Sequence, residues 1–262
     1  MNTRSLKKPS AIEKLTIDLI SQNIHIACIT ETWLLSNIHD SSVKIPGYKI
    51  IRCDRNINNS DKKSGGGVCI YYRTELDVKE LIIDGAELFE LIWATIKIGE
   101  KELIVCILYC PPSIWYKEEL SNHLIETLGD LARDRPTSEF ILLGDFNDFD
   151  VSYLENTDLQ LITTDPTRKN AQLDKVFVNQ PTKVEAEIYK AILPTDHLGI
   201  ILSYSLSLSI VKYKVYIRDE REHRRRMFSE RLSFTNFYGL FYEQSPDVKL
   251  QLLIEFLQCT LN

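Results

Sequence analysis

The stretch EFILLGDFND, residues 139–148, decides how this chain is expected to fold. Its apolar run from Phe140 to Leu143 is typical of a strand buried in a sheet. Gly144 ends the run, and the carboxylate of Asp145 and the amide of Asn147 follow at once. A rigid strand that ends in such groups can present them at the rim of a sheet, where catalytic side chains commonly lie. The stretch therefore predicts a buried strand that leads into a functional site.

The composition of the 262 residues is that of a globular protein with a sizeable core. Hydrophobic residues make up 44% of the chain and charged residues 26%. No apolar run reaches the roughly 18 residues that a membrane helix needs. The first ten residues, MNTRSLKKPS, lack the apolar segment of a secretory signal. We therefore expect an intracellular protein, nuclear or cytoplasmic, that has no membrane partner.

Cysteine spacing argues against a zinc site, and the net charge argues against a site that binds polyanions without help. Cys106 and Cys110 lie four residues apart, but no second pair completes a zinc site, so reduced thiols are expected. The net charge of −6 opposes binding of a polyanion, because phosphate contacts depend on Lys and Arg. An acidic substrate would therefore need metal ions or a local basic patch at the site.

Strand patterns outnumber helical patterns along the chain. Helical spacing covers 11–22 and 117–132, and residues 56–67, NINNSDKKSGGG, read as an exposed, mobile loop. Many neighbouring strands are linked by hairpin-like turns, as at Gly99-Glu100. This pattern predicts a layered α/β sandwich with mixed, largely antiparallel sheets rather than a doubly wound parallel sheet. The expected strands are 25–30, 48–53, 67–73, 89–97, 102–109, 140–144, 173–178 and 197–208.

The character of the chain changes past residue 208. We expect residues 1–208 to form one domain and residues 209–262 a charged, helical extension. The charge run RDEREHRRRMFSER (218–231) is typical of a solvated helix face. Ser245-Pro246 would start a last helix over 247–261, whose leucines on one side suit a docking element.

Polar residues also stand at the ends of several other expected strands. Taken singly, each has an ordinary interpretation as a turn, loop or surface residue. Together they would repel one another at one rim unless a cation lay between them. Oxygen ligands without a cysteine–histidine cluster favour Mg²⁺, or alternatively Mn²⁺. The residues are Glu31, Tyr109, Asp174, Asp196 and His197.

These motifs together resemble the endonuclease/exonuclease/phosphatase superfamily, the fold of DNase I and of abasic-site endonucleases. The similarity is greatest to the apurinic-type endonuclease domain of non-LTR retrotransposons, and the motifs keep that family's order. The resemblance implies a four-layer α/β/β/α sandwich of two mixed sheets, here without its first strand because only Met1 precedes Asn2. The motifs are NTRSL (2–6), TETWL (30–34), GGGVCIYYR (65–73), Tyr109 with Pro111-Pro112, GDFN (144–147), LDKVF (173–177) and TDH (195–197).

The resemblance also implies a metal side of the site. Glu31 would bind the metal with help from Asn2, although an asparagine so near the terminus would be expected to fray. Asp196 would support the metal or the water. Tyr109 would donate a hydrogen bond to a phosphate oxygen.

On the catalytic side, the resemblance implies that Asp145 positions or deprotonates the attacking water. Asn147 would hold the same phosphate group, and Thr167 is a further expected phosphate contact. His197 would stabilise the charge on the reacting phosphate, oriented by a hydrogen bond with Asp174. A general base accelerates a reaction by about 10²–10⁴-fold, and an oriented positive group stabilises the negative charge that develops in the transition state.

The expected function is a Mg²⁺-dependent phosphodiesterase, specifically a DNA-nicking endonuclease of retrotransposon origin that leaves a 3′ hydroxyl. DNA is the expected partner, with no small-molecule cofactor. Two alternatives stay open: a decayed or repurposed copy that acts as a binding module, and a phosphatase or phospholipase of the same superfamily. Nothing resembles a reverse transcriptase, so residues 206–262 are expected to begin a linker region. Abasic-site preference, metal number and protein partners are left open.

Overall fold

The structure is a computed structural model of the chain. It describes residues 1–56, 58–60, 62, 64–112, 116–162, 164–205, 222–234, 237 and 245–261. The chain divides into two units, Met1–Leu208 and Ser209–Asn262, which are described separately.

The larger sheet of the first unit has six strands in the order β4-β5-β6-β7-β9-β8. Every pairing in it is antiparallel except that of β6 with β7, which is parallel. A parallel pair needs a long crossover, and helix α2 (Lys117–Asp134) provides it. The strands are β4 (Asp77–Leu81), β5 (Leu91–Ile98), β6 (Lys101–Tyr109), β7 (Glu139–Asp145), β8 (Gln160–Leu161) and β9 (Asp174–Val178).

A smaller antiparallel sheet has the order β1-β3-β2, and a separate hairpin pairs β10 with β11. Helix α1 (Ala11–Ser21) precedes β1. These strands are β1 (Ile26–Thr30), β2 (Tyr48–Cys53), β3 (Val68–Arg73), β10 (Val184–Tyr189) and β11 (Gly199–Tyr204). Short 3₁₀ helices are η1 (Asp40–Val43), η2 (Ala86–Leu88), η3 (Ser152–Asn156) and η4 (Pro181–Lys183).

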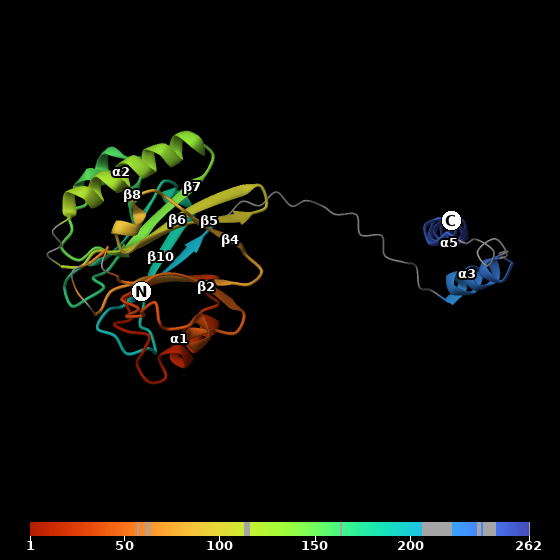
Figure 1. Cartoon of the computed structure of the whole chain (residues 1–262), viewed down its shortest axis with the longest axis horizontal. Helices are drawn as coiled ribbons and strands as arrows, with labels where there is room; N and C mark the ends of the chain where they lie inside the picture. The colour runs from red at the N-terminus through yellow and green to blue at the C-terminus, as the bar shows by residue number, and fades with distance from the viewer. Residues whose placement is uncertain are drawn as a thin grey trace. The chain divides into compact units, whose positions relative to one another are not determined.

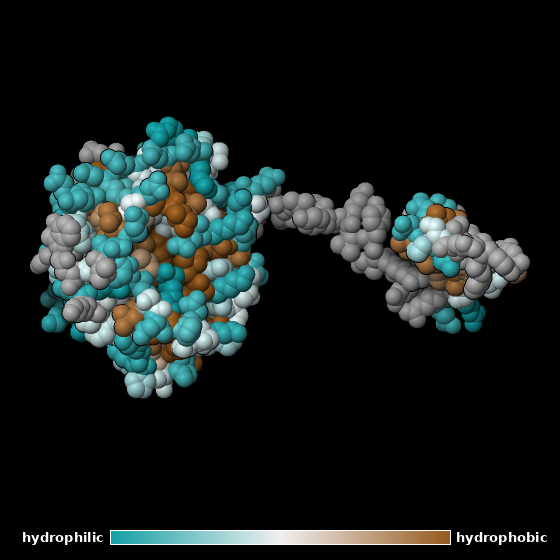
Figure 2. Space-filling model, viewed as in Figure 1, coloured by the Kyte–Doolittle hydropathy of each residue, from teal (hydrophilic) through white to brown (hydrophobic). Residues whose placement is uncertain are grey.

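Three hydrophobic cores separate four layers in this unit. One core lies between α2 and the six-stranded sheet, one between the two sheets, and one between the small sheet and α1. Figure 1 shows the sheets between the two helices. In Figure 2, hydrophobic residues gather in the middle of the visible face of this unit and hydrophilic residues surround them. The α/β/β/α prediction is confirmed.

Strands β6 and β7 are the centre of the sandwich because both of their faces are buried. Ile104 and Phe140 face the core under α2, whereas Val105 and Ile141 face the core between the sheets. Successive side chains of a strand point to opposite faces, so a strand covered on both sides needs a continuous apolar run. This explains why FILL is uniformly apolar.

Three strands were not predicted: β4, β8 and β10. The loop at 56–67 also differs from the expectation of full exposure, because Asn59 and Gly66-Gly67 are buried. Residues 57, 61 and 63 of that loop lie outside the described residues. The hydroxyl of Tyr116 donates a 3.1 Å hydrogen bond to the carbonyl of Asn59, which holds this part of the loop against the core.

The N-terminal residues lie along β1, and the expected fraying of Asn2 is not what the structure has. Asn2 and Thr3 are fully buried, and Asn2 forms a single parallel bridge with Thr30. The carbonyl of Met1 accepts a 3.0 Å hydrogen bond from the Thr30 amide, and the Thr3 amide donates to the Thr30 carbonyl at 3.0 Å. Asn2 is therefore held by backbone pairing although no full strand precedes β1.

The second unit contains α3 (Glu222–Phe234) and α5 (Pro246–Leu261), which contact each other. Most of the charge run falls on α3, and residues 218–221 lie outside the described part of the chain. Within the described residues, no helix combines the length and apolar character needed to cross a bilayer.

Glu139, at the start of β7, connects the β10–β11 hairpin region to the large sheet. The Tyr204 hydroxyl donates a 2.6 Å hydrogen bond to this carboxylate, and the Lys183 ammonium forms an ion pair with it. Burial alone would raise the pKa of Glu139, but these donors hold it below the ordinary value of 4.5. The ionised carboxylate therefore stabilises the folded state above about pH 4.5, and this contribution is lost as the pH falls through the lower folded-state pKa.

We predict that Glu139→Gln lowers the free energy of unfolding at pH 7 by about 1.5 kcal/mol, the size of a hydrogen bond to a charged group. The difference from the wild type should shrink as the pH falls below 4, because the wild-type carboxylate is then protonated. Urea unfolding at several pH values measures both effects. Glu185→Gln, an exposed change on β10, is the matched control, and a pH-independent loss in Glu139→Gln would contradict the assignment.

Candidate active site

The ends of three neighbouring strands bring polar side chains together at one rim of the large sheet. Tyr109 ends β6, Asp145 ends β7, and Asp174 begins β9. Tyr109 pairs with Asp145 and Asp145 pairs with Asp174 in the sheet register. Three residues that are far apart in sequence therefore occupy adjacent positions because of strand pairing alone.

Gly144 allows β7 to approach β6 at this rim. Its φ is +149°, and a Cβ at this position would collide with the carbonyl oxygen of Leu108, its partner in the parallel register. The glycine of the GDFN motif is thus required by the approach of two backbones. The position of Asp145 beside Tyr109 depends on it.

Asn147 turns the chain back just after the strand. It has a φ of +46°, a conformation that asparagine tolerates better than most residues. Its amide N–H donates a 3.0 Å hydrogen bond to Oδ1 of Asp145, and its side-chain Nδ2 donates to the Cys110 carbonyl at 2.8 Å. Asn147 therefore fixes the carboxylate of Asp145 and is itself anchored to the end of β6.

Asn2 joins the two sheets at the site. Its Nδ2 donates to Oε1 of Glu31 at 3.0 Å and to Oδ2 of Asp145 at 2.8 Å. Glu31 follows β1 of the small sheet, whereas Asp145 ends β7 of the large sheet. One buried amide thus holds two carboxylates from different layers at a fixed separation.

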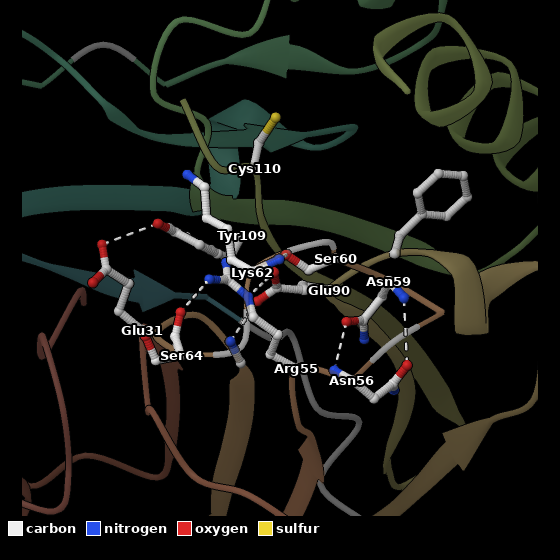
Figure 3. A network of polar contacts seen from close by, with 12 residues as sticks. Glu31, Arg55, Asn56, Asn59, Ser60, Lys62, Ser64, Glu90, Tyr109 and Cys110 are labelled. Carbon is white, nitrogen blue, oxygen red and sulfur yellow. Dashed lines mark hydrogen bonds and ion pairs between the residues drawn. The ribbon is translucent and has the colours of Figure 1, made fainter. Parts of the chain in front are cut away.

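Glu31 is oriented by two further neutral donors. The Tyr109 hydroxyl donates to Oε1 at 3.1 Å (Figure 3), and Nε1 of Trp33 donates to Oε2 at 3.0 Å. Glu31 and Trp33 have φ values of +52° and +56°, in a region that bulky residues rarely adopt. Such backbone strain persists where surrounding contacts fix it, and it clusters at functional sites.

His197 and Asp174 form a buried pair. Nδ1 of His197 lies 2.8 Å from Oδ2 of Asp174, and both residues are at most 5% exposed. Burial would lower the pKa of His197, but the hydrogen bond and charge of Asp174, with the charges of Asp145 and Asp196, raise it above 6.5. The pair therefore favours the protonated form of the imidazole.

Thr195 ties this pair to the N-terminal residues. Its hydroxyl accepts a 3.3 Å hydrogen bond from the His197 amide and donates one of 2.8 Å to the carbonyl of Asn2. Thr167 is fully buried, and its hydroxyl accepts a 3.2 Å hydrogen bond from the Asp174 amide. The structure therefore favours a supporting role for Thr167 over the expected phosphate contact.

The centre concentrates negative charge. Burial and the repulsion of Asp174 raise the pKa of Asp145 to about 6, although the hydrogen bond from Asn2 and the charge of His197 lower it. Ligand atoms of Asp145, Asp174 and His197 all lie within 4.8 Å of one another. Such a group can hold a cation or can act as a base beside an oriented imidazole.

Asp196 lies outside this group, at the rim. Arg168 and Arg4 reach one of its carboxylate oxygens at 2.6 Å and 3.3 Å. Burial alone would raise the pKa of Asp196, but the attraction of Arg168 and Arg4 holds that pKa below its ordinary value. A carboxylate engaged by two guanidinium groups is a weaker candidate for a metal ligand than Glu31 is.

Residues 2–197 match the model of the endonuclease/exonuclease/phosphatase family. The chain belongs to this family. The activities in the family's name are hydrolyses of phosphate esters, so membership supports a phosphodiesterase and a hydrolase acting on phosphodiester bonds. A comparison with curated protein sequences gave no match.

Solved structures of two endonucleases and of one protein complexed with DNA share the family fold with this chain. The endonuclease domain of TRAS1, a telomere-specific non-LTR retrotransposon, has a TM-score of 0.59 at 14% identity, over 79% of this chain and 97% of that chain. The AP endonuclease LMAP of Leishmania major has a TM-score of 0.62 at 12% identity, over 78% of this chain and 86% of that chain. D. rerio TDP2 complexed with single strand DNA product has a TM-score of 0.53 at 14% identity, over 78% of this chain and 96% of that chain. At such identities the likeness shows the fold alone.

Behind the site of this family member lies a buried ion pair that the sequence did not reveal. The guanidinium of Arg55 contacts Oε1 of Glu90 at 2.7 Å, and its Nη1 donates to the Ser64 carbonyl at 2.8 Å (Figure 3). The guanidinium also lies 5.8 Å from the ring centroid of Tyr109. Burial raises the pKa of Glu90 although Arg55 and the Gly67 amide oppose the shift. The pair therefore supports the tyrosine that orients Glu31.

The glycine run next to this pair is structural. Gly66 has a φ of +66°, and a Cβ there would collide with Glu90 and Arg55. The carbonyls of Gly66 and Gly67 accept hydrogen bonds from the amides of Trp33 at 2.8 Å and Thr32 at 3.1 Å. The run thus holds the TETW segment rather than a phosphate.

We predict that Gly66→Ala lowers the free energy of unfolding by about 3 kcal/mol, because left-handed backbone strain adds to overpacking against Arg55 and Glu90. Gly99→Ala is the matched control, since its φ is +63° but nothing lies within 4 Å of the added Cβ. That control should cost about 1 kcal/mol. Chemical denaturation measures both, and equal losses would contradict a close approach at Gly66.

Proposed function

We propose that this chain is a divalent-metal-dependent endonuclease of retrotransposon origin that nicks DNA, with residues 1–208 as its catalytic domain. The observation that carries the proposal is the network in which Asn2 bridges Glu31 and Asp145 beside the buried His197–Asp174 pair. The site therefore combines Glu31 as an oriented carboxylate that can bind a metal cation, Asp145 as a candidate base, and His197 as a candidate positively charged side chain.

The proposed reaction is hydrolysis of one phosphodiester bond. Asp145 takes a proton from the attacking water, whose oxygen forms a new bond to phosphorus. The bond from phosphorus to the 3′ oxygen breaks, and that oxygen gains a proton to leave a 3′ hydroxyl and a 5′ phosphate. Protonated His197, held by Asp174, stabilises the negative charge that develops on the phosphate oxygens. The second N–H of Asn147 Nδ2 is proposed to donate a hydrogen bond to the same phosphate group, and the single O–H of Tyr109, which donates to Glu31 in the structure, would turn to that phosphate when substrate binds.

The residues at the centre fit a hard divalent cation such as Mg²⁺ or Mn²⁺. Their donors are carboxylate and amide oxygens, and three carboxylates from Glu31, Asp145 and Asp174 leave negative charge for a cation to balance. Burial raises the pKa of the nearby Cys110 thiol, which keeps it protonated and unsuited as a ligand. When bound, the cation supplies charge neutralisation at the phosphate oxygens. We propose Glu31 as its holder, with Asn2 helping by fixing that carboxylate through Nδ2 and with Asp196 acting indirectly through its arginines.

DNA as substrate is supported by solved structures that share the fold, two of them endonucleases and a third, D. rerio TDP2, complexed with a single-stranded DNA product. The net charge of −6 favours a smaller substrate, such as that of a phosphatase or phospholipase. Local charge supports DNA as the substrate, because Arg4 and Arg168 lie at the rim of the site. We therefore prefer the DNA-nicking activity.

We predict that the purified chain converts supercoiled plasmid to the open-circular form with Mg²⁺ and not with excess EDTA. Asp145→Asn should reduce the nicking rate by about 10²–10⁴-fold because the base is lost. His197→Ala should reduce it by about 10²–10³-fold because charge stabilisation is lost. Gel electrophoresis with time measures these rates.

Asp77→Asn, an exposed change on β4, is the matched control and should nick at the wild-type rate. Nicking by both site variants at the wild-type rate would exclude this site. Phosphate release from inositol phosphates without nicking would assign the phosphatase alternative. Plasmid binding without any hydrolysis would assign the decayed, binding-only alternative.

A further inference from the structure

An open cavity of about 600 Å³ lies beside the candidate active site. Two of its walls come from segments that also carry site residues: the N-terminal segment that begins with Asn2, and the segment that leads to His197. The third wall is Trp33, which contacts Glu31. The residues that line it are Arg4, Ser5, Lys7, Lys8, Trp33, Pro194, Thr195 and Asp196.

The cavity is basic although the chain as a whole is acidic. It is lined by three cationic side chains and one carboxylate, that of Asp196, which is already engaged by Arg4 and Arg168. Burial and the nearby charge of Arg4 lower the pKa of Lys8, as expected where cations are crowded. Here lies the local basic patch that an anionic substrate of this protein requires.

The cationic groups differ in how they are held. The Lys8 ammonium donates to the carbonyls of Thr3 and Pro194, both at 3.1 Å, and so joins two walls of the cavity. Within the described part of the chain, the Lys7 ammonium has neither a hydrogen bond nor an ion pair. Lys7 is exposed and lines the cavity, so its charge is available to a ligand.

Trp33 gives the cavity a rigid aromatic surface. It is half-buried, and its Nε1 is fixed by the 3.0 Å hydrogen bond to Glu31. Its backbone is held at a φ of +56° by the hydrogen bond from its amide to the Gly66 carbonyl. Because the ring is already ordered, stacking against it costs little conformational entropy.

We propose that this cavity binds an unpaired nucleotide of the DNA strand beside the scissile phosphate, with its phosphate at Lys7 and Arg4 and its base against Trp33. This rests on the proposed function and names the form of its substrate. An aromatic ring within a basic groove is how proteins bind single strands without reading sequence. A base within a duplex is stacked between its neighbours, so only an unpaired or extruded base can meet the indole ring. The cavity therefore favours single-stranded or locally opened DNA over a closed duplex.

The test measures binding separately from cleavage. The full chain carrying Asp145→Asn is titrated into a fluorescein-labelled ten-nucleotide thymidylate strand, and anisotropy gives Kd at several salt concentrations. The same sequence paired in a hairpin duplex is the comparison. We expect the single strand to bind at least tenfold more tightly than the duplex; equal or tighter duplex binding would overturn the proposal.

Variants at two positions test the named contacts. Lys7→Gln should weaken binding about threefold to tenfold and reduce the slope of log K against log salt by about 0.7, the value for one phosphate contact on a single strand. Lys49→Gln, an exposed change on β2, is the matched control and should alter neither quantity. Trp33→Ala should weaken binding about tenfold or more, and Trp33→Phe should restore most of the affinity because it keeps a ring. Unchanged affinity in Lys7→Gln and Trp33→Ala would overturn the proposal.

A small chromogenic diester, bis(p-nitrophenyl) phosphate, separates this proposal from the proposed function. Hydrolysis of this diester by the wild-type chain reports the proposed reaction alone, because the diester has no neighbouring nucleotide to place in the cavity. If the wild type nicks DNA and the cavity variants bind the strand as tightly as the wild type does, the cavity proposal alone is overturned. If the wild type cleaves neither substrate but the Lys7 and Trp33 variants bind the strand more weakly, the proposed function is overturned and the cavity proposal stands.

Discussion

Mutual repulsion of carboxylates in a buried centre is the constraint on which this structure depends. Glu31, Asp145 and Asp174 are held close together by the amide of Asn2, the hydroxyl of Tyr109 and the ring of His197. Burial removes Asp145 and Asp174 from water, so these carboxylates need donors from the protein. These donors come from distant chain segments, two of which are joined by the hydrogen bond from the Thr195 hydroxyl to the Asn2 carbonyl, 193 residues apart. The centre can form only when the whole sandwich has assembled.

The sandwich supplies rigid positions for these donors. Strands β6 and β7 are covered on both faces, and their parallel pairing sets Tyr109 beside Asp145. Gly144 permits this approach, and the Arg55–Glu90 pair supports Tyr109 from behind. Side chains fixed in this way keep their geometry without a ligand, which is the preorganisation that catalysis of phosphate ester hydrolysis requires. The same rigidity holds Trp33 in a strained conformation next to Glu31.

Charge is distributed unevenly around the centre. The chain is acidic overall, yet arginines and lysines gather at the cavity beside the site, where Asp196 orders two of them. In such an arrangement long-range repulsion reduces non-specific attraction to polyanions, while short-range attraction acts only on a strand that enters the cavity. We therefore propose a role for Asp196 on the substrate side of the site, where it pairs with Arg4 and Arg168, rather than at the metal.

The sequence alone indicated a layered α/β sandwich with polar strand ends at one rim, because strands buried on both faces and the residues that end them leave local signatures such as FILLGDFN. Its resemblance to the family added Asn2, whereas Asp196, which was also expected at the metal, lies outside the centre. The sequence did not reveal the Arg55–Glu90 pair, the burial of Asn59 or the arginines around Asp196, and it missed the short edge strands β4, β8 and β10. These features depend on which segments become neighbours across the sheets, and no local pattern records that. Periodicity reports which face of an element is buried; only tertiary structure decides which charge lies opposite it.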